Sequence, residues 1–175
     1  MLLLSRAEVL ALTLVFGSSH AFAASYKIQE AIDIKTLKTT TGQTIVLTGV
    51  DHLDDTDVNE KGVQFLNGLV KGREVMLEDA LPKKKRADVI HAYVWYEVFD
   101  QSHLVQEMNL PRFYFTEKRK NRYKKDGTFV FLNATIIKSG FAKPTEIPTD
   151  PKNFQLFKSL YDQVQSENPP FCQEK

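Results

Sequence analysis

Val89-Ile-His-Ala-Tyr-Val-Trp-Tyr-Glu-Val-Phe99 is the stretch that decides the fold, because its β-branched and aromatic residues are typical of a strand. On its amino-terminal side, Arg73–Glu78 alternates apolar and polar residues and predicts a neighbouring strand. Further outward, Tyr26–Lys38 and Thr44–Val50 predict two more strands. A turn at Gly42 would join these two segments into a hairpin.

Helices are predicted between and after these strands. Lys61–Lys71 carries apolar residues at helical spacing and is followed by Gly72, a residue that commonly ends helices. Ala134–Ser139 predicts a short helix after a short strand at Phe129–Leu132. A final helix is expected to begin at Asp150–Pro151, because Asp is a favoured N-cap residue and Pro is favoured in the first turn.

The order of these segments predicts an α+β, mainly β fold: a five-stranded closed barrel of the oligonucleotide-binding (OB) type with about three helices. Residues 100–128 carry no clear strand or helix pattern and are expected to form an irregular basic insert. Residues 24–168 would form the single domain, and 169–175 a tail.

Composition narrows the class of protein without naming a partner. With 175 residues, 42% hydrophobic and 26% charged, the chain is not disordered, collagen-like or disulfide-dense. The 23 Lys and Arg residues against 22 Asp and Glu residues give a net charge of +1. Total charge therefore points to no partner, and only the distribution of charge along the chain is informative.

Residues 1–23 predict a secretory signal peptide. Arg6 precedes an apolar run, Val9–Phe16, and Ala21–Ala23 fits the small-x-small rule for cleavage after Ala23. A periplasmic or secreted protein is expected, and the alternative for this segment is a short buried helix. No later segment is apolar enough to span a membrane. The single cysteine, Cys172, is either an inert tail residue or a thiol that pairs with another chain.

Several strings resemble segments of the staphylococcal nuclease (thermonuclease) family, in the same order. The match covers about residues 27–165, interrupted by residues 100–128. The strings are Ala31–Thr36, Thr44–Asp51, Val70–Leu77, Ile90–Trp95 and Phe131–Ala142.

The resemblance implies a five-stranded barrel with three helices, and calcium-assisted hydrolysis of DNA and RNA phosphodiesters. That chemistry uses carboxylates to hold the ion, a glutamate to handle the attacking water, and two arginines to neutralise the phosphate. These groups are needed because negative charge builds on the phosphoryl oxygens in the transition state.

Carried over residue by residue, the resemblance implies a degenerate site. Asp51 keeps a ligand position, whereas Lys35 stands at the position of a second ligand Asp. Val46 and Val89 stand at the two arginine positions, and Asp54 at the glutamate position. We therefore expect no cofactor, or calcium at Asp51 if the family site is functional. A positive charge at Lys35 opposes binding of a cation there.

An active nuclease with a rearranged site is the alternative. Arg86 lies three residues before Val89 and would serve as a phosphate ligand if the loop carried it inward. Asp51, Asp54 and Arg86 would then be the catalytic residues.

The other polar residues of this region have two interpretations each. The acids after Asp51 predict either a different oxygen-ligand calcium site or a solvated acidic loop: Asp54, Asp55 and Asp57. His52, beside Asp51, is either a weak acid/base or zinc residue or an ordinary loop residue.

Basic residues interleaved with aromatic ones favour binding of nucleic acid or another polyanion. The candidate binding residues are Lys83, Lys84, Lys85, Arg112, Lys118, Arg119, Lys120, Arg122, Tyr123, Lys124 and Lys125. Anionic lipid, a protein partner, or a solvated loop with no partner are the alternatives. Three functions follow: a degenerate polyanion-binding or protein-binding module, an active nuclease, or a structural scaffold.

Overall fold

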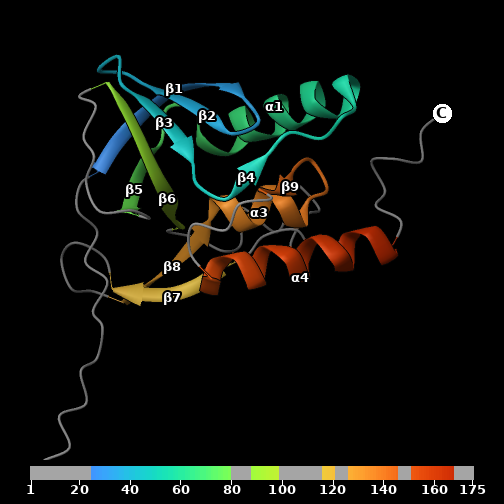
Figure 1. Cartoon of the computed structure of the whole chain (residues 1–175). Helices are drawn as coiled ribbons and strands as arrows, with labels where there is room; N and C mark the ends of the chain where they lie inside the picture. Colours follow the sequence, from blue (N-terminus) through green and yellow to red (C-terminus); the bar gives the residue numbers. More distant parts are fainter. Residues whose placement is uncertain (1–24, 80–87, 99–115, 121–125, 146–150, 168–175) are drawn as a thin grey trace, which may run out of the picture.

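The computed structural model describes residues 25–79, 88–98, 116–120, 126–145 and 151–167 (Figure 1). Three of the segments discussed above lie outside the described residues: the expected signal peptide at 1–23, the basic run at 83–86, and the tail with Cys172. None of the described helices is both long and apolar enough to cross a bilayer.

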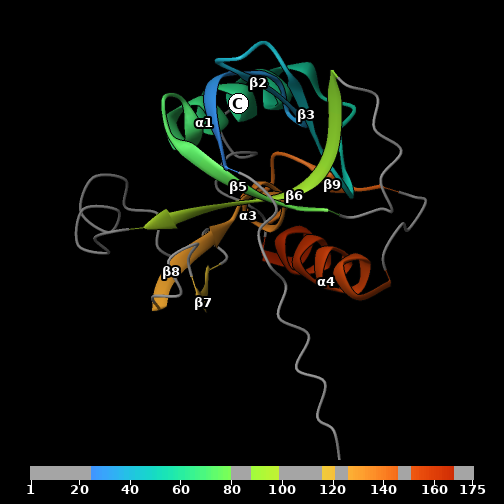
Figure 2. The same cartoon turned by 90° about the vertical axis from the view of Figure 1, so that its left-hand side faces the viewer.

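Five strands form a closed barrel. They are β1 (Ser25–Asp33), β2 (Thr36–Thr39), β3 (Thr44–Leu47), β5 (Glu74–Asp79) and β6 (Val89–Val98). Their order is β3-β2-β1-β5-β6, and a parallel pairing between β3 and β6 closes the ring, as Figure 2 shows. The predicted mainly β, five-stranded barrel is confirmed, and its form is compatible with an OB-like barrel.

The prediction of one long strand at Tyr26–Lys38 is wrong. The chain turns at Ile34 and Lys35, so that β1 and β2 are separate antiparallel strands and Asp33 pairs with Thr36. The backbone N–H of Lys35 donates to Asp33 Oδ1 at 2.8 Å, an Asx turn that supplies the reversal without a glycine. Two consecutive hairpins therefore replace the single predicted one.

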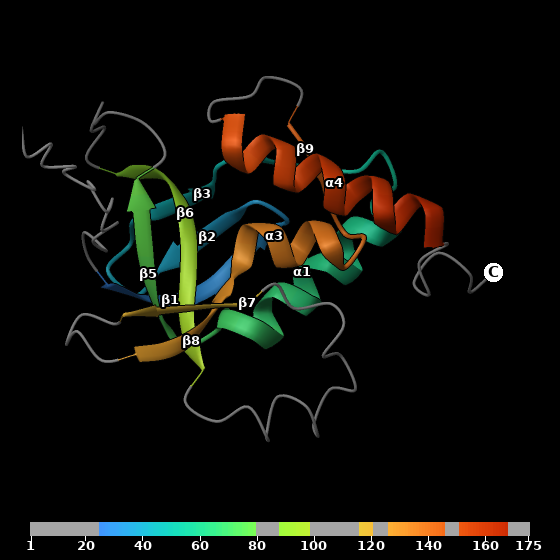
Figure 3. The ribbon, with the colours of Figure 1, turned by 90° about the horizontal axis from the view of Figure 1, so that it is seen from below.

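Three helices lie beside the barrel: α1 (Thr56–Val70), α3 (Leu132–Lys138) and α4 (Pro151–Glu167). Figure 3 shows α3 between the other two. The first helix begins at Thr56 instead of Lys61, because Asp55 caps it by accepting from the backbone N–H groups of Asp57 and Val58. Part of the predicted acidic loop is thus a helix start.

Two further strands extend the barrel sheet past β6, in the order β6-β8-β7. They are β8 (Asp126–Phe131) and β7 (Thr116–Lys120), which form an antiparallel pair. The prediction that all of residues 100–128 are irregular is therefore wrong for 116–120 and 126–128. A small second sheet pairs β4 (Val50–Asp51) with β9 (Lys143–Pro144).

Asn133 fastens the helical layer to the barrel. Its side chain is fully buried and accepts from the backbone N–H of Val94 at 2.8 Å. It donates to the carbonyl of Thr48 at 2.9 Å and to that of Ala92 at 3.4 Å. One amide thus satisfies backbone groups of β6 and of the turn before β4, far apart in the sequence.

An aromatic cluster lies on the side of β6 that faces α4. Trp95 stacks on Phe131 with ring centroids 4.1 Å apart, and Phe157 of α4 packs against Phe131 at 5.6 Å. The indole N–H of Trp95 donates to Glu78 Oε2 at 3.1 Å. As the chain's only tryptophan, Trp95 is an intrinsic probe of this cluster.

Candidate functional site

The turn between β1 and β2 presents Lys35 to the segment that follows β3. Ile34 is fully buried and anchors the turn, while Lys35 is half-exposed. The carbonyl of Lys35 accepts from the backbone N–H of Leu47 at 2.7 Å, which holds the turn against the end of β3. The position of Lys35 is therefore set by the barrel and not by a flexible loop.

Asp51 is positioned by a tight turn and by α4. Gly49 has a φ of 79°, a left-handed conformation that glycine adopts without strain. A Cβ at Gly49 would lie 2.7 Å from a ring atom of Phe157 in α4. The turn can therefore pack against α4 only because glycine has no side chain. Two residues later, Asp51 pairs in β4 with Lys143 of β9.

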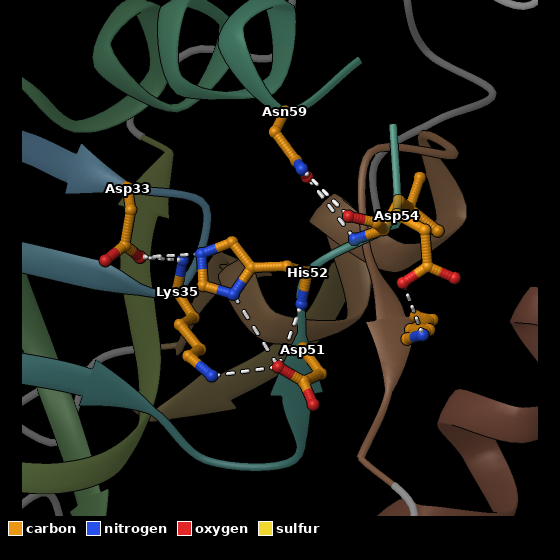
Figure 4. A network of polar contacts seen from close by, with 8 residues as sticks. Asp33, Lys35, Asp51, His52, Asp54 and Asn59 are labelled. Atoms are coloured by element: carbon orange, nitrogen blue, oxygen red, sulfur yellow. Dashed lines mark hydrogen bonds and ion pairs between the residues drawn. The ribbon is translucent and has the colours of Figure 1, made fainter. Parts of the chain in front are cut away.

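Lys35 and Asp51 form a direct ion pair. Lys35 Nζ donates to Asp51 Oδ1 at 2.8 Å, with the two side chains 32% and 41% exposed (Figure 4). This hydrogen bond lowers the pKa of Asp51 below its ordinary value, against the opposing effect of partial burial. The backbone N–H of His52, 3.0 Å from the same oxygen, lowers the pKa further. Asp51 is therefore an ionised carboxylate whose partner is an ammonium group.

The imidazole of His52 lies between two carboxylates. Its Nδ1 is 3.6 Å from Asp51 Oδ1, and its Nε2 is 3.6 Å from Asp33 Oδ1 (Figure 4). Both distances exceed that of a good hydrogen bond. We call Asp33, Lys35, Asp51 and His52 the polar cluster; it joins the β1–β2 turn to the end of β4.

The Lys35 ammonium opposes binding of a divalent cation at Asp51. Within the part of the chain that the structure describes, no group of three or more His, Cys, Asp and Glu residues could hold a metal ion. A cation bound at Asp51 would have to displace the Lys35 ammonium from the oxygen that it contacts. The lysine thus supplies the positive charge beside this carboxylate.

The acids after Asp51 serve different purposes. The Asp54 side chain is 99% exposed and lies 3.5 Å from Lys143 Nζ, whereas the Asp55 carboxylate caps α1. Asn59 brackets the intervening backbone by donating to the carbonyl of Leu53 at 2.9 Å and accepting from its N–H at 3.3 Å. All three acids are exposed: Asp55 caps α1, Asp57 lies in its first turn, and Asp54 lies before the cap.

Neither valine at the expected arginine positions can bind phosphate. In the parallel pair of β3 and β6, Val46 is opposite His91 and Thr44 is opposite Val89, so both valines lie on the outer face of the barrel. Val46 is half-buried and Val89 is 37% exposed. Neither side chain offers a hydrogen-bond donor to a phosphate, and Thr44 and His91 lie on the same face.

The basic candidates divide into two groups. Lys118, Arg119 and Lys120 make up most of β7, at the edge of the extended sheet. The others lie outside the described residues: Lys83, Lys84, Lys85, Arg86, Arg112, Arg122, Tyr123, Lys124 and Lys125. The sequence analysis gave no role to Asp33, Lys143 or Asn59. For Asp33, the usable signal is the tendency of Asp to accept from the backbone N–H two residues later, here that of Lys35.

Comparison with known proteins does not assign the chain to a family. No protein-family model matches the chain, and no curated protein matches it either.

Proposed function

We propose that this chain is an exported, thermonuclease-type barrel that no longer hydrolyses phosphodiesters and instead binds a polyanion, with nucleic acid as the first candidate. The proposed loss of hydrolysis rests on the 2.8 Å contact between Lys35 Nζ and Asp51 Oδ1. It places a fixed ammonium on the carboxylate that a nuclease would use to bind its cation.

The surrounding residues support the same proposal. Hydrolysis requires donors that stabilise the charge developing on the phosphate, and loss of one such donor costs about 10²–10³-fold in rate. Val46 and Val89, at the two positions where arginines would be expected, offer no donor. Loss of the cation and of both donors together leaves no route to rapid phosphodiester cleavage.

The polyanion is proposed from the distribution of basic residues. Five consecutive residues of β7 include Lys118, Arg119 and Lys120. In sequence the basic runs at 83–86 and 112–125 add further Lys and Arg residues with aromatic residues among them. Such a composition suits phosphate contacts combined with base stacking, which is how single strands are bound without sequence preference.

Two assays on the mature chain test the proposal. Single-stranded DNA and RNA are incubated with the protein in calcium and then in chelator, and no cleavage is expected in either. Calcium-dependent cleavage that Asp51→Ala abolishes would refute the proposal and favour the rearranged nuclease with Asp51, Asp54 and Arg86. Binding is then titrated at increasing salt, and affinity at low salt should fall steeply as salt rises. No affinity at low salt would instead favour the scaffold.

A further inference from the structure

The side-chain amide of Asn67 joins the end of α1 to β1. Its Oδ1 accepts from the backbone N–H of Ala31 at 2.9 Å, and its Nδ2 donates to the carbonyl of Ala31 at 3.3 Å. The same Nδ2 donates to the carbonyl of Val63, one helical turn earlier, at 3.1 Å. The amide therefore bonds both backbone groups of Ala31, as a neighbouring strand would.

Asn67 is also the only asparagine in the chain that precedes a glycine. In an asparagine–glycine pair, the backbone nitrogen of the glycine can attack the side-chain Cγ of the asparagine, because the glycine has no Cβ to hinder the approach. Apart from its own helix, a Cβ built on Gly68 would meet no atom of the described residues within 4 Å. Asn67 and Gly68 thus form a reactive pair at an exposed position of α1.

The folded helix holds the two reacting atoms apart. The N–H of Gly68 belongs to the hydrogen-bond ladder of α1, and the amide of Asn67 is directed at β1. Attack therefore requires the last turn of α1, which ends at Val70, to open. Glycine is a poor helix former and helix ends fray, and both properties favour opening. Leu69 and Val70 are 2% and 0% exposed and oppose it, so that the open state is a minor one.

We propose that Asn67 is a site of spontaneous deamidation, that the reaction occurs only while the last turn of α1 is open, and that it releases α1 from β1. The Gly68 nitrogen forms a bond to Asn67 Cγ and gives up its proton, while the bond between Cγ and Nδ2 breaks and ammonia leaves. Water then opens the cyclic succinimide at either carbonyl, which leaves aspartate or isoaspartate at position 67. One water is taken up and one ammonia is released, with no change of oxidation state.

The product cannot make the bonds of the asparagine. A carboxylate has no N–H group, so it cannot donate to the carbonyls of Ala31 and Val63, and its negative charge repels them. Isoaspartate also adds a methylene group to the main chain, which breaks the helical spacing at this point. Ala31 lies two residues before Asp33, so loss of the contact weakens the end of β1 that carries one carboxylate of the polar cluster.

The rate of deamidation is measured on the mature chain in mildly alkaline buffer and in urea that unfolds it. Trypsin cuts after Lys61 and Lys71, and the peptide 62–71 contains Asn67 as its only asparagine. Mass spectrometry then follows the gain in mass that replacement of NH2 by OH produces, relative to a sample digested at the start. We expect this gain in both solutions, at least about tenfold more slowly in buffer, because only the open fraction of α1 reacts.

Asn59 and Asn133 are the matched internal controls. Each also holds backbone groups through its amide, but each is followed by a residue that has a side chain. Their peptides should gain no mass over the same period. Gly68→Ala places a methyl group beside the reacting nitrogen, so it should slow the gain at Asn67 several-fold even in urea, where no helix remains.

Each part of the proposal has an outcome that overturns it. No gain in mass by the peptide 62–71 in urea, or equal gains by the control peptides, would overturn the assignment of Asn67. Equal rates in buffer and in urea would overturn the control by α1. Deamidated protein, separated by anion exchange through its added negative charge, should melt about 2–8 °C lower than the unmodified chain, as should Asn67→Asp. An unchanged Tm would overturn the release of α1 from β1, and the deamidated wild-type chain supplies this measurement if Asn67→Asp does not fold.

Discussion

Lys35→Asp is the substitution that most directly tests whether a lysine has taken the place of a cation. It removes the ammonium 2.8 Å from Asp51 Oδ1 and adds a third carboxylate near those of Asp33 and Asp51. The lost pair is partly exposed and is worth at most about 1 kcal/mol. The new repulsion between like charges about 4 Å apart in a watery site is worth about 1 kcal/mol more. Without metal, the variant should therefore be less stable by about 1–2 kcal/mol, which lowers Tm by about 2–8 °C for a chain of this size.

Calcium should reverse that loss in the variant alone. A modest oxygen-ligand site has a Kd of about 10⁻⁴–10⁻³ M. At about 10 mM calcium, the linkage term RT ln(1 + [L]/Kd) is then about 1.4–2.7 kcal/mol. Tm of Lys35→Asp should rise by about 3–10 °C on adding calcium.

The assay is thermal unfolding followed by Trp95 fluorescence, with calcium and with chelator. Lys38→Asp is the matched control, since it makes the same charge change on β2 at a position paired with Thr44 and without a contact to the polar cluster. Neither that control nor the wild-type chain should respond to calcium. A calcium response of the wild type would refute the argument that Lys35 excludes a cation, and no response of Lys35→Asp would refute the argument that a carboxylate there completes a site.

Three further predictions concern stability. Because its folded-state pKa is lowered, ionised Asp51 stabilises the fold above its unfolded pKa of about 3.9, and this stabilisation is lost as pH falls through the folded value. The Tm difference between wild type and Asp51→Asn should thus vanish in acid melts, and a constant difference would contradict the Lys35 pairing. Asn133→Leu leaves buried backbone groups unsatisfied and should lower the free energy of unfolding, measured in urea, by about 2–4 kcal/mol. A loss under 1 kcal/mol would mean that the Asn133 hydrogen bonds do not hold the helical layer to the barrel. Gly68 has open space around it, so Gly68→Ala should stabilise α1 by about 0.5–1 kcal/mol. Gly62→Ala should instead destabilise the protein, since the new Cβ would lie 2.5 Å from Ile34 Cδ1. Equal shifts in Tm for the two variants would refute this contrast.

The barrel could be predicted where local sequence and final environment agree. The strands at Thr44–Leu47 and Val89–Val98 are rich in β-branched and aromatic residues and are largely buried. The first helix ends where Gly72 adopts a φ of 77°. In these places the pattern of apolar residues is imposed by the same core that the strands and helices enclose.

The strand breaks and edge strands could not be predicted from such patterns. The turn at Ile34–Lys35 contains no glycine or proline, and its apolar residue is buried, so the segment has the pattern of a continuous strand. β7 consists of Thr-Glu-Lys-Arg-Lys, and a five-residue strand at a sheet edge is bonded on one side and needs no apolar face. Its strand conformation comes from pairing with β8, a partner that composition does not reveal.

The polar cluster was only partly predictable. A resemblance put Lys35 and Asp51 at related positions, but their contact requires the β1–β2 turn and the Gly49 turn to bring together residues 16 apart. The role of His52 between two carboxylates depends on Asp33, which the sequence reading left without a role. Contacts of this kind are set by the geometry of the barrel, so the spacing of apolar residues in the sequence does not predict them.

The polar cluster and Arg73 lie near opposite ends of β1. Asp33 ends that strand, whereas the carbonyl of Arg73 accepts from the backbone N–H of Ile28, near its start, at 2.9 Å. Five residues of strand span about 16 Å, more than a Debye length at physiological salt, so the charges of one site act weakly on the other. A lysine beside Asp51 therefore has little effect on the electrostatic potential around Arg73. The proposed loss of hydrolysis and the proposed binding of a polyanion are therefore compatible in one fold, since they depend on different residues.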